Sequence, residues 1–250
     1  YDGVAWVKLA GKWGLIDILG NIIAEPQYSF IDIFDGSFAK VGKCVDENKY
    51  QYGLIDTVGE VVLPMEYDEI LRWDNGYYVV RKDELYGLLS PSLHVAIEPK
   101  RKYLKKLNDK YILELVNSDY PGWYNLMDYY GNGIICRDEY RGFITVEELE
   151  NGFLKALYFR SEYKAGSRYG IYNSTGKQIY YNDHCDDITY FGDNLFLVKE
   201  FIYSGSGLAG HDKYKIVNCQ GEVLFNKYYD SIELLKNGNF LISKNDLYGL

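Results

Sequence analysis

The sequence lacks the features by which several large classes of protein are identified. No apolar stretch approaches the roughly 18 residues of a membrane-spanning helix. Apolar residues show no sustained helical periodicity. The first residues, Tyr1 to Trp6, have neither the charged nor the apolar region of a secretion signal, although a signal peptide could precede them. We therefore expect no membrane insertion and no helical fold.

Positive charge is also scarce. The chain has 27 Lys and Arg against 36 Asp and Glu, which gives a formal net charge of -9 at pH 7. The longest basic run, Lys100-Arg101-Lys102, is short, and no basic stripe could neutralise a phosphate backbone. We interpret this run as a solvated strand edge. Nucleic acid is not an expected partner.

Cysteine and histidine are few and scattered. No CxxC pair occurs, which argues against a zinc site or a redox motif, and the thiols stand alone at Cys44, Cys136, Cys185 and Cys219. Isolated thiols fit a reducing compartment slightly better than an oxidising one, which favours the cytoplasm. The three His belong to no catalytic triad or zinc motif. The sequence predicts no catalytic residue, no metal site and no cofactor.

Tyrosine and glycine, in contrast, are abundant, with 27 and 25 copies. This composition favours short strands joined by tight turns. Comparing the chain with itself reveals a repeat of about 39 residues, a length typical of one supersecondary unit. Each copy begins with an aromatic residue, usually followed by Gly, two apolar residues and Asp, Asn or Ser. The copies begin at Trp13, Tyr52, Tyr86, Tyr124, Tyr169 and Tyr214, and Tyr248 begins a seventh.

The best copies define a structural motif. Its residues are Trp13, Gly14, Asp17, Tyr52, Gly53, Asp56, Tyr86, Gly87, Tyr169 and Gly170. We interpret the recurring aromatic residue as a contact between repeats. The apolar residues that follow it should be mostly buried, namely Leu15, Ile16, Leu54, Ile55, Leu88, Ile171 and Ile216.

The rest of each copy predicts turns and strands. Three residues after the Asp, Asn or Ser comes a Gly in five of six copies, the spacing of a turn that an Asx residue opens. Calcium could also bind such repeated oxygen donors, but Asn and Ser share the position and favour the turn. A Tyr-Asp-x-Ile segment such as Tyr67 to Ile70 follows, then an Asn-Gly or Asp-Gly hairpin signal and a last apolar strand. Each repeat should therefore form four short strands that must stack on neighbours to bury their apolar faces.

One cluster combines groups that could form a metal site or an activated thiol, namely His184-Cys185-Asp186-Asp187. In the repeat alignment, Cys185-Asp186 takes the place of Tyr67-Asp68. We therefore favour a structural position.

Together these segments resemble bacterial WG repeats, also called KWG repeats. Gly11 to Asp17 is the best copy, and Val62-Leu63-Pro64 and Tyr67 to Ile70 match later parts of the pattern. The resemblance covers essentially the whole chain and implies an all-β repeat fold with a non-catalytic role in binding or assembly. Three copies depart from it, at Leu93, Asn125 and Lys215. Asn at a glycine position is the replacement that left-handed backbone geometry best allows.

We expect residues 1–250 to form a single array of about six repeats that starts and ends within a repeat. Two architectures fit this pattern: a β-propeller-like arrangement, open or closed, and a twisted β-solenoid.

The predicted function is a binding or scaffolding surface for a protein partner, because repeat arrays present long surfaces and no catalytic group is recognisable. The alternative is a carbohydrate-binding module that uses exposed aromatic residues, and a hydrolase with paired carboxylates is a distant third. Insertions recur at the junction between the last strand of one repeat and the aromatic strand of the next, for example at Gly42 to Gln51. Such insertions form a binding face or reflect neutral variation in loop length. The candidate binding residues at these junctions are Tyr120, Trp123, Tyr158, Arg160, Tyr163, Arg168 and Tyr203.

Overall fold

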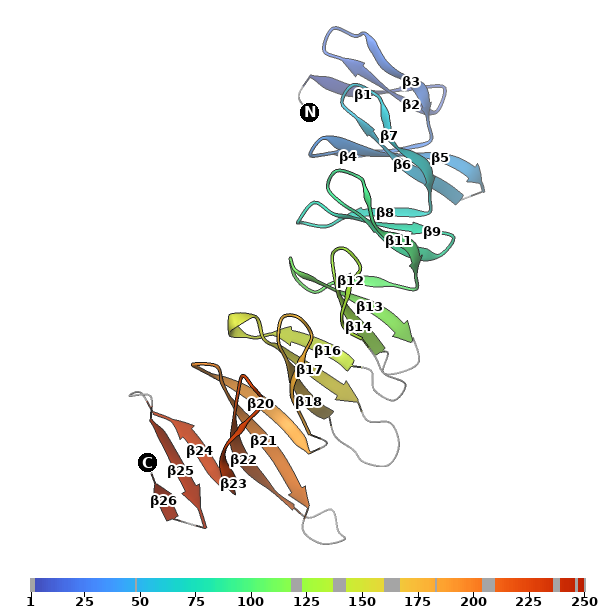
Figure 1. The fold of residues 1–250 in the computed structure, drawn as a ribbon. Helices are drawn as coiled ribbons and strands as arrows, with labels where there is room; N and C mark the ends of the chain where they lie inside the picture. Colours follow the sequence, from blue (N-terminus) through green and yellow to red (C-terminus); the bar gives the residue numbers. More distant parts are fainter. Residues whose placement is uncertain are drawn as a thin grey trace. The chain divides into compact units, whose positions relative to one another are not determined.

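The computed structural model describes most of the chain (Figure 1). The described residues are 3–47, 49–117, 123–136, 143–159, 167–182, 184–203, 210–235, 239–245 and 247–249, without the side chains of 117, 159, 167, 225–227 and 248–249. They form antiparallel strands and one 3-10 turn, Glu150–Gly152. Within these ranges, no helix is both long and apolar enough to span a membrane. The expected all-β fold is confirmed.

The chain forms two compact units. Unit 1 comprises residues 1–114 and 128–132, and unit 2 comprises residues 115–127 and 133–250. Each is built from repeats of the same kind.

Unit 1 contains a three-stranded sheet followed by two four-stranded sheets. The first consists of β1 (Val4–Leu9), β2 (Lys12–Asp17) and β3 (Ile22–Tyr28). The second consists of β4 (Phe30–Asp35), β5 (Phe38–Asp46), β6 (Lys49–Asp56) and β7 (Val61–Tyr67). The third consists of β8 (Glu69–Arg72), β9 (Tyr78–Lys82), β10 (Leu85–Leu89) and β11 (Val95–Arg101). Then β12 (Leu104–Lys106) pairs with β13 (Tyr111–Asn117), whose first residues belong to this unit.

Unit 2 continues the same order. After the last residues of β13 it contains β14 (Trp123–Asp128) up to Met127, which pairs with β15 (Gly133–Ile135) and β16 (Phe143–Glu148). It continues with β17 (Leu154–Phe159), β18 (Ser167–Tyr172) and β19 (Gln178–Tyr181). The next sheet consists of β20 (Cys185–Gly192), β21 (Leu195–Tyr203), β22 (Gly210–Asn218) and β23 (Val223–Tyr229). The last consists of β24 (Ser231–Leu234), β25 (Phe240–Lys244) and β26 (Leu247–Gly249).

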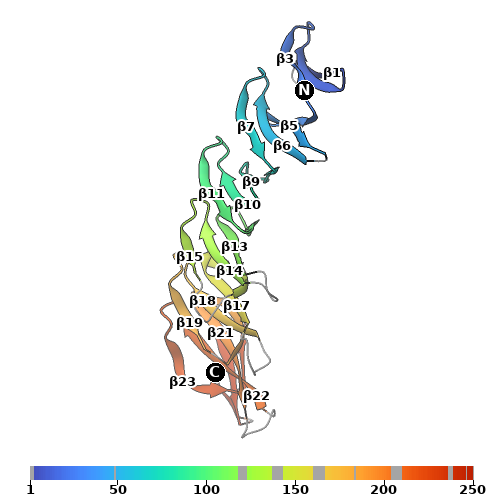
Figure 2. The same cartoon turned by 90° about the vertical axis from the view of Figure 1, so that its right-hand side faces the viewer.

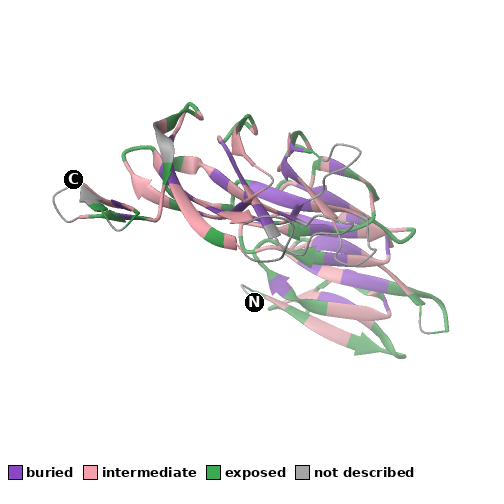
Figure 3. Ribbon diagram, turned by 90° about the horizontal axis from the view of Figure 1, so that it is seen from below, coloured by how far each residue is buried: buried purple, intermediate pink, exposed green. Residues whose placement is uncertain are grey.

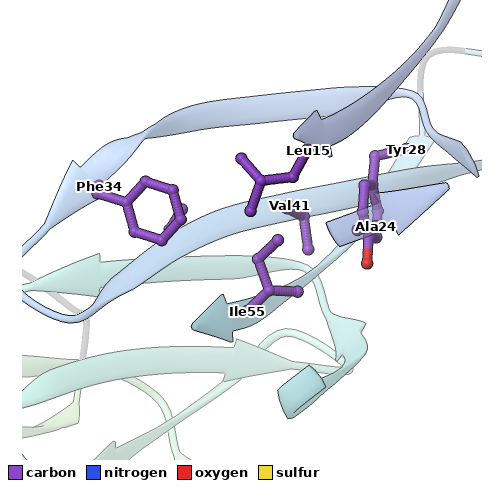
Figure 4. Close-up of a cluster of buried hydrophobic side chains, with 7 residues drawn as sticks. Leu15, Ala24, Tyr28, Phe34, Val41 and Ile55 are labelled. Carbon is purple, nitrogen blue, oxygen red and sulfur yellow. The ribbon is translucent and has the colours of Figure 1, made fainter. Parts of the chain in front are cut away.

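Within a unit, consecutive sheets pack face to face. Figure 4 shows this between the first two sheets, where a buried cluster contains Leu15, Ala24, Tyr28, Phe34, Val41 and Ile55. A second cluster joins the next two sheets through Leu54, Tyr67, Val80 and Leu89. In unit 2, Ile171 packs against Val198 and Val217 in the same manner. Figure 3 shows the buried residues on the strands and the exposed ones mostly at the turns.

The recurring motif alternates between the two faces of its strand. Trp13 and Leu15 pack toward the second sheet, whereas Ile55 of that sheet packs back on them. Tyr52 and Leu54 then pack toward the third sheet. The predicted core is confirmed for Leu15, Leu54, Ile55, Leu88, Ile171 and Ile216, which are at most 2% exposed. Ile16 is only half-buried, because it belongs to the face of the first sheet opposite Leu15 and stays outside that cluster.

The glycine after each aromatic residue in unit 1 is needed for close approach, not for left-handed backbone. Gly14, Gly53 and Gly87 are absent from the positive-φ residues. A Cβ atom on Gly53 would lie 2.4 Å from the Leu63 carbonyl oxygen, because the third strand bulges toward it between Leu63 and Tyr67. The expectation that left-handed geometry governs this position, and so admits Asn, is wrong.

The predicted Asx turns are confirmed. The Asp17 carboxylate accepts hydrogen bonds from the backbone N–H groups of Leu19 and Asn21, both at 2.8 Å. A hydrogen bond from the Asn21 side chain, with that from its backbone, lowers the pKa of Asp17. Asp56, Asp128, Asn173 and Asn218 accept equivalent backbone bonds. Their oxygens therefore hold turns.

The third repeat makes the same turn without glycine. Leu93 has φ +63° and donates its backbone N–H to the Ser90 carbonyl at 2.8 Å. Its side chain packs against the cluster between the second and third sheets, as does that of Val62. Burial of the side chain offsets the backbone strain of a non-glycine residue at positive φ.

A lysine link between neighbouring sheets recurs in both units. Lys40 in β5 and Lys155 in β17 lie at the same register position, opposite the first apolar residue of the motif strand. Lys40 Nζ donates to the Ile70 carbonyl at 3.5 Å, and Lys155 Nζ donates to the Ile188 carbonyl at 2.8 Å. Each therefore bonds the Tyr-Asp-x-Ile strand of the next sheet.

Candidate binding surfaces

The candidate residues at the junctions divide into three groups. Tyr120, Arg160 and Tyr163 lie outside the described residues. Trp123 and Tyr203 are half-buried, and Tyr203 packs edge-on against Phe201 and His184. Tyr158 and Arg168 are buried, so they do not form an exposed binding surface.

Tyr158 and Arg168 are buried because the junction is lengthened by strand and not only by loop. They pair across β17 and β18, whose ladder extends to Phe159 and Ser167. The Tyr158 ring packs on Phe143 and Tyr181, and its hydroxyl hydrogen-bonds that of Tyr172. The prediction that Tyr158 and Arg168 are exposed is therefore wrong, and residues 160–166 of this junction lie outside the described part of the chain.

Arg168 has a structural role that the repeat explains. Its Nη1 lies 2.5 Å from Asp186 Oδ1. Arg168 directly precedes the motif aromatic, and Asp186 belongs to the next Tyr-Asp segment. At the same two positions, Lys12 Nζ donates to Ser29 Oγ at 2.7 Å, and Lys213 pairs with Asp230. The basic residue before the aromatic thus links the motif strand to the segment that leads into the next sheet.

The His184-Cys185-Asp186-Asp187 cluster is structural as well. The Cys185 side chain is fully buried in the core between β18 and β20–β22. Burial, followed by the nearby Glu200 carboxylate, raises the pKa of Cys185 to about 12. Because the thiolate is the reactive form, this cysteine is not an activated nucleophile.

Unit 2 contains a buried ion pair that the sequence did not suggest. Glu200 is fully buried and lies 2.7 Å from Lys215 Nζ. Its carboxylate also accepts hydrogen bonds from the hydroxyls of Tyr180 at 2.6 Å and Tyr228 at 2.7 Å. Lys215 stands at the glycine position of the motif, and its Nζ lies over both tyrosine rings. Departure from the motif was the signal that could have identified this site.

One edge of unit 1 carries a ledge at a predicted junction. The β5–β6 hairpin pairs Gly42 with Tyr52 and then continues to Cys44 and Tyr50. The neighbouring β9–β10 hairpin ends shortly after the equivalent pair, at Asp83 and Glu84. The longer hairpin therefore extends past the shorter one (Figure 1). We call this side the junction edge.

A cavity of about 520 Å³ lies at the ledge. It is lined by Lys49, Tyr50, Tyr52, Asp68, Arg81, Asp83 and Glu84. The Tyr50 and Tyr52 rings are nearly parallel, with an interplanar angle of 20° and centroids 6.1 Å apart. Arg81 Nε lies 3.4 Å from Glu69 Oε2. Charges of both signs therefore face a pair of aromatic rings.

A smaller cavity of about 230 Å³ opens between the same two sheets, beside the β4–β5 and β8–β9 turns. Its charged groups are paired with one another. Arg72 Nη1 lies 2.6 Å from Asp35 Oδ1, and Lys40 Nζ lies 3.6 Å from Asp32 Oδ2. These pairs leave it poorly suited to a charged ligand.

A different edge of unit 1 is apolar. The turns after β2, β6 and β10 succeed one another along one side, which we call the turn edge (Figure 2). Successive turns are close, since a Cβ on Gly59 would lie 2.7 Å from the Ile23 carbonyl oxygen. The turn edge, including the 128–132 turn, exposes Ile18 and Leu19 (both 81%), Tyr130 (76%), Val58 (68%), Ile22, Val61 and Val95. In unit 2 the turn residues are polar at Thr175 and Gln220.

Comparisons with known proteins identify the repeat. The family described as WG containing repeat matches residues 13–43 and 52–86. The resemblance inferred from the motif is therefore confirmed over two repeats. No curated protein matches the chain.

Similar solved structures are distant. Prolyl oligopeptidase B from Galerina marginata is 11% identical with a TM-score of 0.32, over 82% of this chain and 36% of that one. TolB from Acinetobacter baumannii is 9% identical with a TM-score of 0.27, over 89% and 63%. The extracellular domain of the putative one component system BT4673 from B. thetaiotaomicron is 12% identical with a TM-score of 0.25, over 99% and 37%. This chain spans about a third of the first of these proteins. Likeness at this level supports no argument about function.

Proposed function

We propose that this array of WG repeats is a non-catalytic binding module whose turn edge in unit 1 contacts a protein partner. The observation that supports the proposal is the row of exposed apolar side chains on that edge. Exposed apolar residues on a soluble protein are usually scattered, and a contiguous row is typical of an interaction site. The core does not require these residues, because Ile18, Leu19 and Val58 lie in turns that Asp17 and Asp56 already hold.

The form of the row indicates the form of the partner. Stacked sheets lie about 10 Å apart, so the turns after β2 and β6 present apolar groups at about that spacing. The flanking turn carboxylates are occupied by backbone N–H groups. An elongated partner with its own apolar stripe would therefore gain by burying this edge.

The proposal is tested with the triple variant Ile18→Ser, Leu19→Ser and Val58→Ser. The purified chain is used as bait, a captured protein is identified, and its affinity is measured by calorimetry. The triple variant should lose at least tenfold in affinity and keep the melting temperature of the parent, because these side chains are exposed. The matched control is Gln220→Ser, in the equivalent turn of unit 2. A partner that binds parent and triple variant equally would exclude the turn edge.

A further inference from the structure

We infer that the ledge cavity of the junction edge binds a short neutral oligosaccharide. This site lies on other residues than the proposed protein contact, and neither proposal depends on the other. The inference combines three features of the cavity: an aromatic wall, charges of both signs and an origin in unequal hairpin lengths.

The aromatic wall exists because neighbouring hairpins differ in length. Tyr52 packs against the core between the second and third sheets. Tyr50 lies two residues further out on the same face of β6, at the level of the Asp83-Glu84 turn where the next hairpin ends. Its half-buried ring therefore lines the cavity instead of a core. The face of a tyrosine ring is apolar, and its hydroxyl group is polar and can stay hydrated. Such a ring can pack against the C–H face of a sugar.

The two positive and three negative groups of the lining largely cancel, so the cavity offers no strong net charge to an ion. A cation in the cavity would face Lys49 and Arg81, and an anion would face Asp68, Asp83 and Glu84. A neutral polyol avoids both repulsions. Its hydroxyl groups can donate to the carboxylates and accept from the ammonium and guanidinium groups. Hydrogen bonds to charged groups are also stronger than those between neutral groups.

The ledge groups are available for such bonds. Within the described part of the chain, Lys49, Asp68, Asp83 and Glu84 form no ion pair, whereas Asp35 and Arg72 of the smaller cavity are paired at 2.6 Å. Asp83 and Glu84 have φ +51° and +64°, so this tight turn holds two acidic side chains where Asn-Gly is usual. The ledge cavity is also the larger of the two.

The test is a titration of the intact chain with chitobiose, cellobiose, maltose and lactose, followed by calorimetry or NMR. Trilysine and inorganic phosphate serve as charged probes. At least one disaccharide should bind saturably at millimolar concentration, and both charged probes should bind at least tenfold more weakly.

Tyr50→Ala should weaken the disaccharide at least tenfold. The matched control, Tyr130→Ala, removes a more exposed tyrosine from the turn edge of the same unit and should leave the disaccharide affinity unchanged. A second variant joins Lys43 to Gln51 through Asp-Glu, which shortens β5–β6 to the length of β9–β10, and it should also abolish binding.

Three results would overturn the inference: no disaccharide binds, Tyr50→Ala binds it as tightly as the parent, or trilysine binds more tightly than every disaccharide. The last result would identify the ledge as a site for basic peptides. The turn-edge triple variant should bind the disaccharide normally, so failure of one proposal is distinguishable from failure of the other.

Discussion

Units 1 and 2 differ at one position of the repeat, the residue after the motif aromatic. In unit 1 it is Gly14, Gly53 and Gly87. In unit 2 it is Asn125, Gly170, Lys215 and Gly249. The preceding strand pairs with this position in the same way in both units, as at Gly53, Gly170 and Lys215, so that side of the motif strand does not explain the difference.

The third strand explains it. In unit 1 that strand contains Pro26, Pro64 or Pro99 and bulges so that its backbone touches the glycine. Unit 2 has no proline in β15, β19 or β23. The nearest atoms to a Cβ on Gly170 are at 3.3 Å or more. A glycine in a repeat motif can thus be required by the backbone of the neighbouring strand. It can be replaced when that strand no longer approaches it closely.

Lys215 illustrates how the freed position is used. Opposite Tyr214 and Ile216, the third strand runs from Tyr229 to Leu224, one residue more than the run from Tyr67 to Leu63 in unit 1. The lysine pairs with buried Glu200. Unit 2 therefore replaces a close backbone contact by a buried polar network.

The largest loss of stability is expected from a substitution of Lys215, where unit 2 departs from the glycine of unit 1. Replacing it with the motif residue, Lys215→Gly, leaves the Glu200 carboxylate buried without its cation. Removing one partner of a buried pair costs about 3 to 5 kcal/mol. We expect that loss in the free energy of unfolding from urea denaturation, with faster hydrogen exchange in β22. Adding Glu200→Gln should recover part of it. A Lys215→Gly chain as stable as the parent would falsify this account.

The next effect tests what the two units share. Leu54→Ala in unit 1 and Ile216→Ala in unit 2 should each cost about 2 to 5 kcal/mol, because both side chains are buried between sheets. Ile16→Ala is the internal control and should cost less, since Ile16 is only half-buried. Urea denaturation measures all three. Losses below about 0.5 kcal/mol at Leu54 and Ile216 would mean that the repeat register is wrong.

A smaller effect sharpens the glycine comparison. Gly53→Ala places a Cβ within 2.4 Å of a backbone oxygen and should destabilise by about 1 to 3 kcal/mol through overpacking. Gly170→Ala meets no such contact and should change stability by less than about 1 kcal/mol, since alanine is also the better strand residue. Thermal and urea unfolding measure the two losses of stability. Equal losses at the two positions would show that the bulge does not explain the need for glycine at position 53.

The smallest effect is a pH dependence specific to unit 2. Burial raises the pKa of Glu200, but hydrogen bonds from Lys215, Tyr180 and Tyr228 outweigh burial and hold it below the ordinary 4.5. The folded-state pKa is lowered, so this stabilisation is complete above pH 4.5 and is lost as the pH falls through the folded-state value.

One proton contributes a slope of at most about 1.4 kcal/mol per pH unit. Hydrogen exchange in β21 and β22 at decreasing pH measures it. Glu200→Gln should abolish this slope in unit 2 and leave unit 1 unchanged. A slope that persists in Glu200→Gln must come from another carboxylate.

Much of the fold could be predicted because the same pattern of aromatic, apolar and turn residues recurs in each repeat. Six copies of the motif align the buried residues, and alternation along a strand gives the face of each. The Asx turns follow from the residue type and from the spacing to glycine. Leu93 takes the place of that glycine at the same spacing and still makes the turn, because its side chain gains burial that a glycine lacks.

The candidate site was harder to predict. Junction length pointed to a variable edge, and in unit 1 the β5–β6 hairpin is longer than the β9–β10 hairpin at this junction. Tyr158 and Arg168 were assigned to it wrongly, because a longer junction can be longer strand as well as longer loop. Tyr50 went unnoticed, since its exposure depends on the length of the neighbouring hairpin and not on its own repeat.

By itself, the sequence determined the repeat, the strand order, the turns and the alternation of buried residues, because these depend on local spacing and on residue type. Only the tertiary structure decided why glycine is needed after the aromatic, which charged residues are buried and paired, and where a cavity opens. The physical reason is that these properties arise between strands and between sheets. A bulge in one strand excludes a Cβ on another, and a short hairpin exposes a ring on the longer one beside it. Such contacts are set by packing distances that no single repeat encodes.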